Sequence, residues 1–173
     1  EIIKIVVSEK VNDKFHVLAS VSSPSKGIKN GFITDSKMAV LSIKNALKEV
    51  NNSLGIKIDK VVACIPPANA RMDIVMGSTN VIDYNEITGV DVSNALLSAI
   101  KDQDFTHEEL VTAMPISFTI DDTPNIKDPK GMKGSVLEVR LVISMVPKEP
   151  LYRILEVLKL SGVETVDTSF TSV

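Results

Sequence analysis

The sequence predicts an α/β body that carries a smaller α+β insertion. Runs rich in β-branched residues alternate with amphipathic helical stretches, which is typical of a sheet covered by helices. The end of the chain repeats an earlier order of helix, glycine and strand, with Leu160-Ser161-Gly162-Val163 echoing Ser53-Leu54-Gly55-Ile56. Between these copies lies a segment ordered as strand, helix, strand and strand. We therefore expect residues 1–68 and 148–173 to form one body, and residues 69–147 to form the insertion.

The body begins with a predicted β-hairpin. Residues 2–8 and 15–21 are β-rich and are joined by the polar run 9–14. Gly27 and Gly31 then bracket a basic loop, after which residues 31–34 give a short strand.

The clearest predicted element is the helix that follows. Apolar residues recur at spacings of three and four, with Asp35 or Ser36 as the N-cap and Gly55 as the stop; they are Val40, Ile43, Leu47, Val50 and Leu54. The helix leads into residues 58–65, whose apolar run predicts a strand covered on both faces and ended by Pro66-Pro67. The single cysteine, Cys64, lies in this run and is interpreted as a core residue, because it has no second cysteine for a disulfide or a zinc site.

The insertion is predicted to open with a strand at residues 72–76, a loop at 77–80 and a short strand at 81–84. Thr88 and Asp91 resemble a capping box at the start of a helix. The residues of that helix expected to face the core are Val92, Ala95, Leu96, Ala99 and Ile100. Residues 109–121 and 136–146 are long β-rich runs that flank a loop at 123–134.

After Pro147, a second amphipathic helix is predicted, with Gly162 as its stop and residues 163–170 as the last strand. The apolar residues of this helix are Leu151, Ile154, Leu155 and Leu158. We expect this helix and strand to return to the first sheet.

Catalytic constellations are weak. His16 and His107 lie far apart and beside no convincing nucleophile, so both are expected at the surface. The carboxylates at 102/104, 108/109 and 121/122 would support a hydrolase only if two of them converged in a cleft. The glycine pairs 27/31 and 131/134 fit neither nucleotide fingerprint. Because lysines surround both pairs, anion binding stays open beside a role as turn glycines.

Charge is distributed unevenly along the chain. Residues 1–68 carry a net +4, residues 69–147 a net −6 and residues 148–173 a net −1. The total of only −3 gives no sign of a nucleic-acid-binding surface. An acidic insertion suits a basic partner surface, although a solvated acidic face without a partner explains the charge equally well.

Three ordered motifs resemble the FtsA family of actin-like bacterial cell-division proteins. Residues 25–35 (SKGIKNGFITD) are similar to its SKGIKKG segment, and residues 125–134 (NIKDPKGMKG), followed by Leu137-Glu138-Val139, are similar to its GI(K/R)DP-x-GM-x-G. Residues 115–121 (PISFTID) resemble its P-x-x-F-x-V-D, and residues 86–88 match its EIT. Residues 68–80 match the family poorly, which leaves the edge of the insertion open.

The resemblance implies an actin/Hsp70-like ATPase-fold subdomain, 1A, with a mixed sheet and helices, that is incomplete and carries the insertion 1C. The family binds ATP and Mg²⁺, polymerises, binds FtsZ and tethers the FtsZ ring through a C-terminal membrane helix. The matching phosphate loop would precede residue 1, so we expect a longer natural protein and neither cofactor nor enzyme activity in this segment. The implied partners are FtsA neighbours in the filament, FtsZ and later divisome proteins, at the cytoplasmic face of the membrane.

The insertion also contains a candidate contact region, its loop 125–134. We expect this loop to lie exposed at the end of the insertion, because its charged side chains are costly to bury unpaired and its proline and glycines fix turns. We expect the loop and Arg71 to serve protein interaction. The residues so assigned are Asn125, Ile126, Lys127, Asp128, Pro129, Gly131, Met132, Gly134 and Arg71. Alternatives are a PilM-like pilus-assembly protein, the first lobe of an actin-like ATPase or sugar-kinase-type enzyme, and a small-ligand-binding α+β domain.

Overall fold

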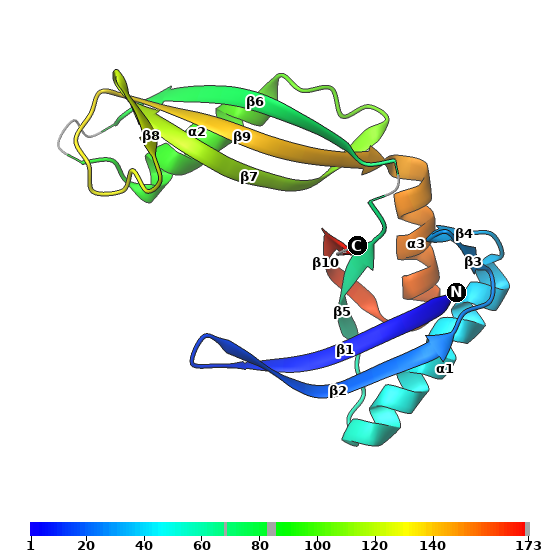
Figure 1. Cartoon of the computed structure of the whole chain (residues 1–173). Coiled ribbons are helices and arrows are strands. Elements are labelled where there is room, and N and C mark those ends of the chain that lie inside the picture. Colours follow the sequence, from blue (N-terminus) through cyan, green and yellow to red (C-terminus); the bar gives the residue numbers. More distant parts are fainter. Residues whose placement is uncertain (68, 83–85, 172–173) are drawn as a thin grey trace. The chain divides into compact units, whose positions relative to one another are not determined.

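The computed structural model describes residues 1–67, 69–82 and 86–171. The chain divides into two compact units (Figure 1). Unit 1 comprises Glu1–Ala68 and Lys148–Val173, and unit 2 comprises Asn69–Pro147. Each unit has its own hydrophobic core, so each is described by itself.

Two tight hairpins open unit 1. Strands β1 (Ile2–Val11) and β2 (Lys14–Pro24) pair antiparallel around Asn12 and Asp13, which both have positive φ. Two central residues with positive φ form a type I′ turn, whose twist matches the right-handed twist of the two strands. The predicted hairpin is therefore confirmed, with longer strands and a shorter turn than expected.

The second hairpin joins β3 (Ile28–Lys29) to β4 (Phe32–Ile33) through Asn30 and Gly31. Gly31 has φ +77°, and a Cβ there would lie 2.2 Å from Cγ of Pro66. Glycine is needed for both reasons, which confirms its interpretation as a turn residue.

Helix α1 (Ser36–Leu54) has both predicted caps. The Asp35 carboxylate accepts a hydrogen bond from the Met38 N–H at 3.0 Å, and Gly55 ends the helix with φ +69°. Ile43, Leu47 and Val50 are buried, as the apolar spacing predicts. No helix in the described ranges is long and apolar enough to cross a membrane.

The remaining elements of unit 1 are β5 (Lys60–Ile65), α3 (Lys148–Leu160) and β10 (Glu164–Phe170), and β10 pairs parallel to β5. The unit 1 core combines residues of α1 and of the C-terminal segment: Ala39, Ile43, Leu47, Val157 and Val163. The last helix and strand thus return to the first body. The strands form separate β1–β2 and β5–β10 ladders instead of one continuous sheet, and α1 and α3 join them through apolar contacts.

The prediction that Cys64 lies in the core is wrong. Ala63 and Ile65 of β5 are buried, whereas Val62 is 55% exposed and Cys64 is exposed. Side chains alternate across a strand, so the continuous apolar run places half of its members on a face that the described residues leave uncovered.

Unit 2 is a four-stranded antiparallel sheet with one helix behind it (Figure 1). Its elements are β6 (Arg71–Asn80), α2 (Gly89–Lys101), β7 (Glu108–Ile120), β8 (Thr123–Ile126) and β9 (Val136–Pro147), and the strand order is β6-β9-β7-β8. The central strand β9 supplies the largest share of the core, with alternate residues facing α2: Leu137, Val139, Leu141, Ile143 and Met145.

Three local predictions for unit 2 need correction. Residues 77–80 continue β6 instead of forming a loop, because Gly77 is the place where α2 packs on the strand: a Cβ there would lie 2.3 Å from the Ala99 nitrogen. Residues 81–82 form no strand, and residues 83–84 lie outside the described residues. The first four residues of the predicted loop 123–134 form β8, which pairs with β7.

Candidate functional site

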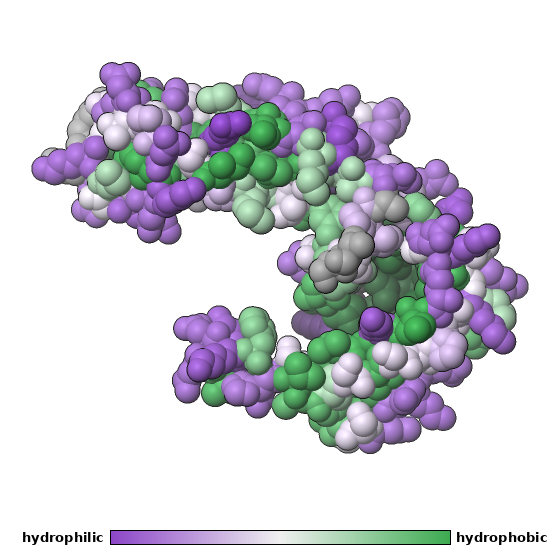
Figure 2. All heavy atoms as spheres, viewed as in Figure 1, coloured by the Kyte–Doolittle hydropathy of each residue, from purple (hydrophilic) through white to green (hydrophobic). Residues whose placement is uncertain are grey.

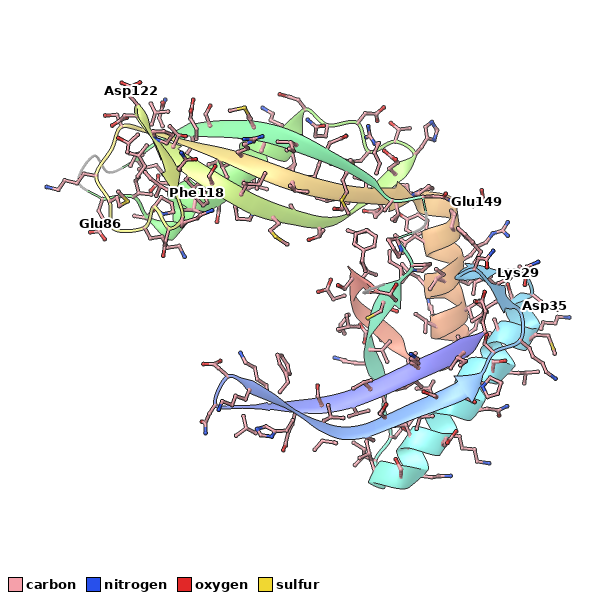
Figure 3. All side chains as sticks on the ribbon, viewed as in Figure 1. Lys29, Asp35, Glu86, Phe118, Asp122 and Glu149 are labelled. Atoms are coloured by element: carbon pink, nitrogen blue, oxygen red, sulfur yellow. The ribbon has the colours of Figure 1, made fainter. Side chains whose placement is uncertain are left out.

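The predicted contact residues of the insertion lie mainly in one segment, Asn125–Gly134, which we call the contact loop. Its first two residues end β8, where Ile126 pairs with Phe118 of β7. Figure 3 labels Phe118. Asn125 has a φ of +65°, a conformation that asparagine tolerates better than most residues. The register of the β7–β8 pair shifts here, so Asn125 lies at an irregularity of β8 one residue before the strand ends.

Two backbone hydrogen bonds hold the middle of the contact loop against the segment before α2. The Gly131 N–H donates to the Ile87 carbonyl at 3.0 Å, and the Ile87 N–H donates to the Met132 carbonyl at 2.8 Å. Ile87 is almost completely buried in the unit 2 core, and Pro129 is also buried. Pro129 is thus more than the turn former that the sequence indicates, because it anchors the loop.

The side chains between these anchors point outward. Lys127, Asp128 and Lys130 are exposed, as predicted from the cost of burying unpaired charges. The Asp128 carboxylate accepts a hydrogen bond from the Lys130 N–H at 3.2 Å, and Lys127 Nζ donates to the Ile116 carbonyl at 3.2 Å. Met132 adds a half-exposed apolar side chain. The loop therefore presents charged and apolar groups from a fixed backbone.

The end of the contact loop is held just as closely. A Cβ at Gly134 would lie 2.2 Å from Cγ2 of Ile120, so only glycine fits there. The Asp121 carboxylate then accepts hydrogen bonds from the N–H groups of Ser135 at 3.0 Å and Val136 at 2.9 Å. These bonds fix the return of the chain into β9.

Asp91 supports the contact loop from inside the unit. The predicted capping box with Thr88 is confirmed, and the buried Asp91 carboxylate accepts hydrogen bonds from Thr88 Oγ1 at 2.6 Å, the Thr88 N–H at 2.8 Å and the Ile82 N–H at 3.1 Å. The Thr88 hydroxyl contributes most to lowering the pKa of Asp91. Because Ile87 precedes the cap, this network fixes the residue to which the loop is bonded. The capping motif predicted the start of the helix, but it did not predict that the same network supports the contact loop.

Arg71 does not join the contact loop. It lies opposite Met145 at one end of the sheet, while Asn80 and Val136 pair at the other end, where the loop returns into β9. Nine residues of strand separate the two places, or about 30 Å at 3.3 Å per residue. Arg71 instead forms ion pairs with Asp73 at 3.0 Å and Glu108 at 2.9 Å.

The remaining polar candidates stay apart. His16 and His107 are exposed, as predicted. Asp102 caps the end of α2, and Asp121 lies in the turn after β7. Within the described ranges, no three His, Cys, Asp or Glu side chains gather as they would around a metal ion. Gly27 and Gly31 sit in turns, and the Asn30 and Gly31 N–H groups donate to the Glu1 carboxylate.

Residues 69–145 match the family model described as the SHS2 domain inserted in FtsA. The chain is 31% identical over 163 residues to the cell division protein FtsA of Streptococcus pneumoniae, which covers 94% of this chain and 36% of that protein. It is 26% identical over 165 residues to FtsA of Bacillus subtilis, with 95% and 38% covered. The chain thus spans a little over a third of these relatives. The resemblance to FtsA that the motifs indicate is confirmed.

A solved chain of the PilM-PilN type IV pilus biogenesis complex shares the fold, with a TM-score of 0.61. It is 16% identical, and the likeness covers 98% of this chain and 44% of that one. At this identity the likeness concerns the fold alone. The predicted fold class, an α/β body that carries an α+β insertion, is confirmed.

Proposed function

We propose, from its resemblance to FtsA over nearly its whole length, that the chain is the protein-interaction part of an actin-like cell-division protein. In this proposal, unit 1 corresponds to an incomplete subdomain 1A and unit 2 to the insertion 1C. Unit 2 contacts neighbouring copies in a filament and later-arriving division proteins. In the same proposal, binding of FtsZ and tethering of the FtsZ ring to the cytoplasmic face of the membrane are functions of other segments of the longer protein.

The observation that carries the proposal is the rigid, exposed contact loop. Its backbone is fixed by the two hydrogen bonds to Ile87, while the side chains of Lys127, Asp128 and Lys130 are exposed. A preorganised loop loses little conformational entropy on binding, so more of its contact energy appears as affinity. Loops on a rigid scaffold are also where binding residues concentrate.

An enzyme is the weaker alternative. The described residues bring together no acid–base pair in a cleft, and the exposed His16 and His107 lie in different units. We propose that the segment has no enzyme activity and no cofactor of its own, and that ATP and Mg²⁺ belong to the longer proteins of this family.

The proposal is tested by measuring how the purified chain binds to the gene product that contains it and to that product's division partners. We expect Asp128→Ala to weaken this binding several-fold, because the carboxylate is exposed and fixes the local turn. Glu156→Ala, which removes an exposed carboxylate from α3, is the matched control and should bind like the original chain.

Thermal unfolding separates a contact role from a structural one. If Asp128→Ala lowers the thermal midpoint by more than about 8 °C, which is over about 1 kcal/mol in a domain of this size, the carboxylate serves folding. Equal binding by the two variants would refute the assignment of the loop.

A further inference from the structure

An unusual surface of unit 2 lies on the side of the sheet away from α2, which we call the open face. Strand β6 directs Met72, Ile74 and Met76 to this face, and they are 63%, 56% and 70% exposed. Met114 of β7, opposite Val142 of β9, is 64% exposed and continues the row. Figure 2 shows hydrophobic residues gathered over these strands. Exposed apolar patches of this kind mark interaction sites more often than isolated apolar residues do.

Strand β6 is also an edge of the sheet, because it pairs only with β9 in the order β6-β9-β7-β8. In an antiparallel pair, the backbone groups of alternate residues point away from the partner strand. The Ser78 N–H points away in this manner, since it donates to Ser98 Oγ of α2 at 3.2 Å. The backbone N–H and C=O groups of Met72, Ile74 and Met76 therefore point away from β9 too. Within the described ranges, these groups form no hydrogen bond.

Helix α2 meets β6 most closely at Gly77 and Ser78, and Val75 also packs in the core with Ala95 and Ala99. In the part of the chain that the structure describes, no hydrogen bond ties the outward backbone groups of Met72, Ile74 and Met76 to α2. Six residues of strand span about 20 Å, enough for three pairs of residues that exchange hydrogen bonds with an added strand. The unpartnered backbone groups of the edge and the exposed apolar side chains thus belong to the same three residues.

The two sides of this edge differ in chemistry. Side chains of an added strand that point to the open face would lie beside Met72, Ile74 and Met76. Those that point to the α2 side would lie beside Asp73, which is 36% exposed. There Arg71 is shared between the carboxylates of Asp73 and Glu108, so one negative charge remains in excess. The C-terminal end of α2, with its negative partial charge, lies on the same side.

We propose that β6 binds an extended segment of another protein whose apolar and basic residues alternate, and that this segment adds as a fifth strand beside Met72–Met76. The inference rests on the proposed role as an interaction module and names the chemistry of one partner. Main-chain hydrogen bonds give such an added strand its affinity, and alternate side chains give it specificity. A second copy of the chain fits less well, because unit 2 carries a net −6 and would bring its own Asp73 to the same side.

The experiment uses the whole 173-residue chain and an acetylated peptide of alternating lysine and valine, seven residues long. Binding is followed by fluorescence anisotropy and by amide hydrogen exchange. We expect saturable binding that slows exchange at Met72, Ile74 and Met76. A peptide with the valines and lysines in separate blocks, and one with glutamate for lysine, should each bind at least tenfold more weakly.

Variants of the chain locate the site. Ile74→Lys keeps the backbone and removes the central apolar contact, so it should weaken binding at least tenfold, and Met76→Lys should act in the same direction. Val90→Lys places a lysine at an equally exposed apolar position of α2, outside the edge, and should change nothing. Circular dichroism checks that each variant is folded.

Three results would overturn the inference: equal binding of the block peptide, protection that appears elsewhere, or protection of the three amides that grows with protein concentration without peptide. The last result would mean that a second copy occupies the edge. Asp128→Ala should bind the peptide normally, because it lies at the far end of the sheet. If the peptide does not bind at β6 but Asp128→Ala still weakens binding to the division partners, only the strand-addition site is rejected.

Discussion

Gly77 is the position where a single added methyl group tests the fold of unit 2 most sharply. In a strand with ordinary φ, replacing glycine by alanine stabilises by about 0.5–1 kcal/mol, because alanine loses less backbone freedom on folding. At Gly77 the new Cβ would lie 2.3 Å from the Ala99 nitrogen and 2.4 Å from the Ala95 oxygen. Both are backbone atoms, so no side-chain rotation relieves the overlap and α2 must move.

Overpacking typically costs about 1–3 kcal/mol, and a clash with helix backbone belongs at the upper end. We therefore expect Gly77→Ala to destabilise unit 2 by about 2–3 kcal/mol, opposite in sign to the intrinsic effect. Since about 1.4 kcal/mol is a factor of ten in an equilibrium, amide exchange through opening of unit 2 should accelerate roughly 30- to 150-fold.

Hydrogen exchange at Leu141 and Ile143, in the central strand of unit 2, measures this change without interference from unit 1. Gly89→Ala is the matched control, because a Cβ at the start of α2 meets nothing within 4 Å. That variant should exchange at the original rate or more slowly. Unchanged or slower exchange in Gly77→Ala would refute the close packing of α2 on β6.

Other predictions follow from the polar contacts and the turns. Asp91 has a lowered pKa, so its carboxylate stabilises unit 2 in full above about pH 5, where the unfolded group is also ionised, and this contribution is lost as pH falls through the folded pKa. Asp91→Asn should therefore lower the free energy of unfolding at neutral pH and reduce how much of it is lost on acidification. Unfolding curves from about pH 2 to pH 6 measure this, and an unchanged dependence on pH in the variant would contradict it. Gly31→Ala should destabilise unit 1, because it combines φ +77° with a 2.2 Å approach to Pro66, and a thermal midpoint equal to the original would argue against that geometry. Titration with a fluorescent ATP analogue and Mg²⁺ should be flat, whereas saturable micromolar binding would reveal a nucleotide site in this segment. Sedimentation velocity over a hundredfold concentration range should show mainly monomer, since a filament contact joins two different patches, and a tight dimer would reveal a self-complementary interface.

Local signals predicted much of the fold. The spacing of Ile43, Leu47 and Val50, with Asp35 and Gly55 as caps, defined α1, and Thr88 with Asp91 defined the start of α2. These features depend on contacts within a few residues, so the sequence contains them. The lysines and Asp128 of the contact loop were expected at the surface because unpaired charges are costly to bury.

The errors concern contacts between distant residues. Gly77 resembled a loop residue because the close approach of Ala99, which explains it, depends on tertiary packing. Cys64 resembled a core residue because an apolar strand does not reveal whether both of its faces are covered. Two further features, the burial of Pro129 and the distance of Arg71 from the contact loop, depend on tertiary contacts and strand register, which the sequence did not predict.

The central claim, that unit 2 is a contact module of an FtsA-like division protein, is tested most directly by photo-crosslinking. A photoreactive amino acid is placed at Asp128 in the gene product that contains this chain, and at Glu156 as the control, and dividing cells are irradiated. Mass spectrometry should find position 128 joined to a second copy or to another division protein, with few such products from position 156. Identical products from both positions, or none from position 128, would contradict the claim.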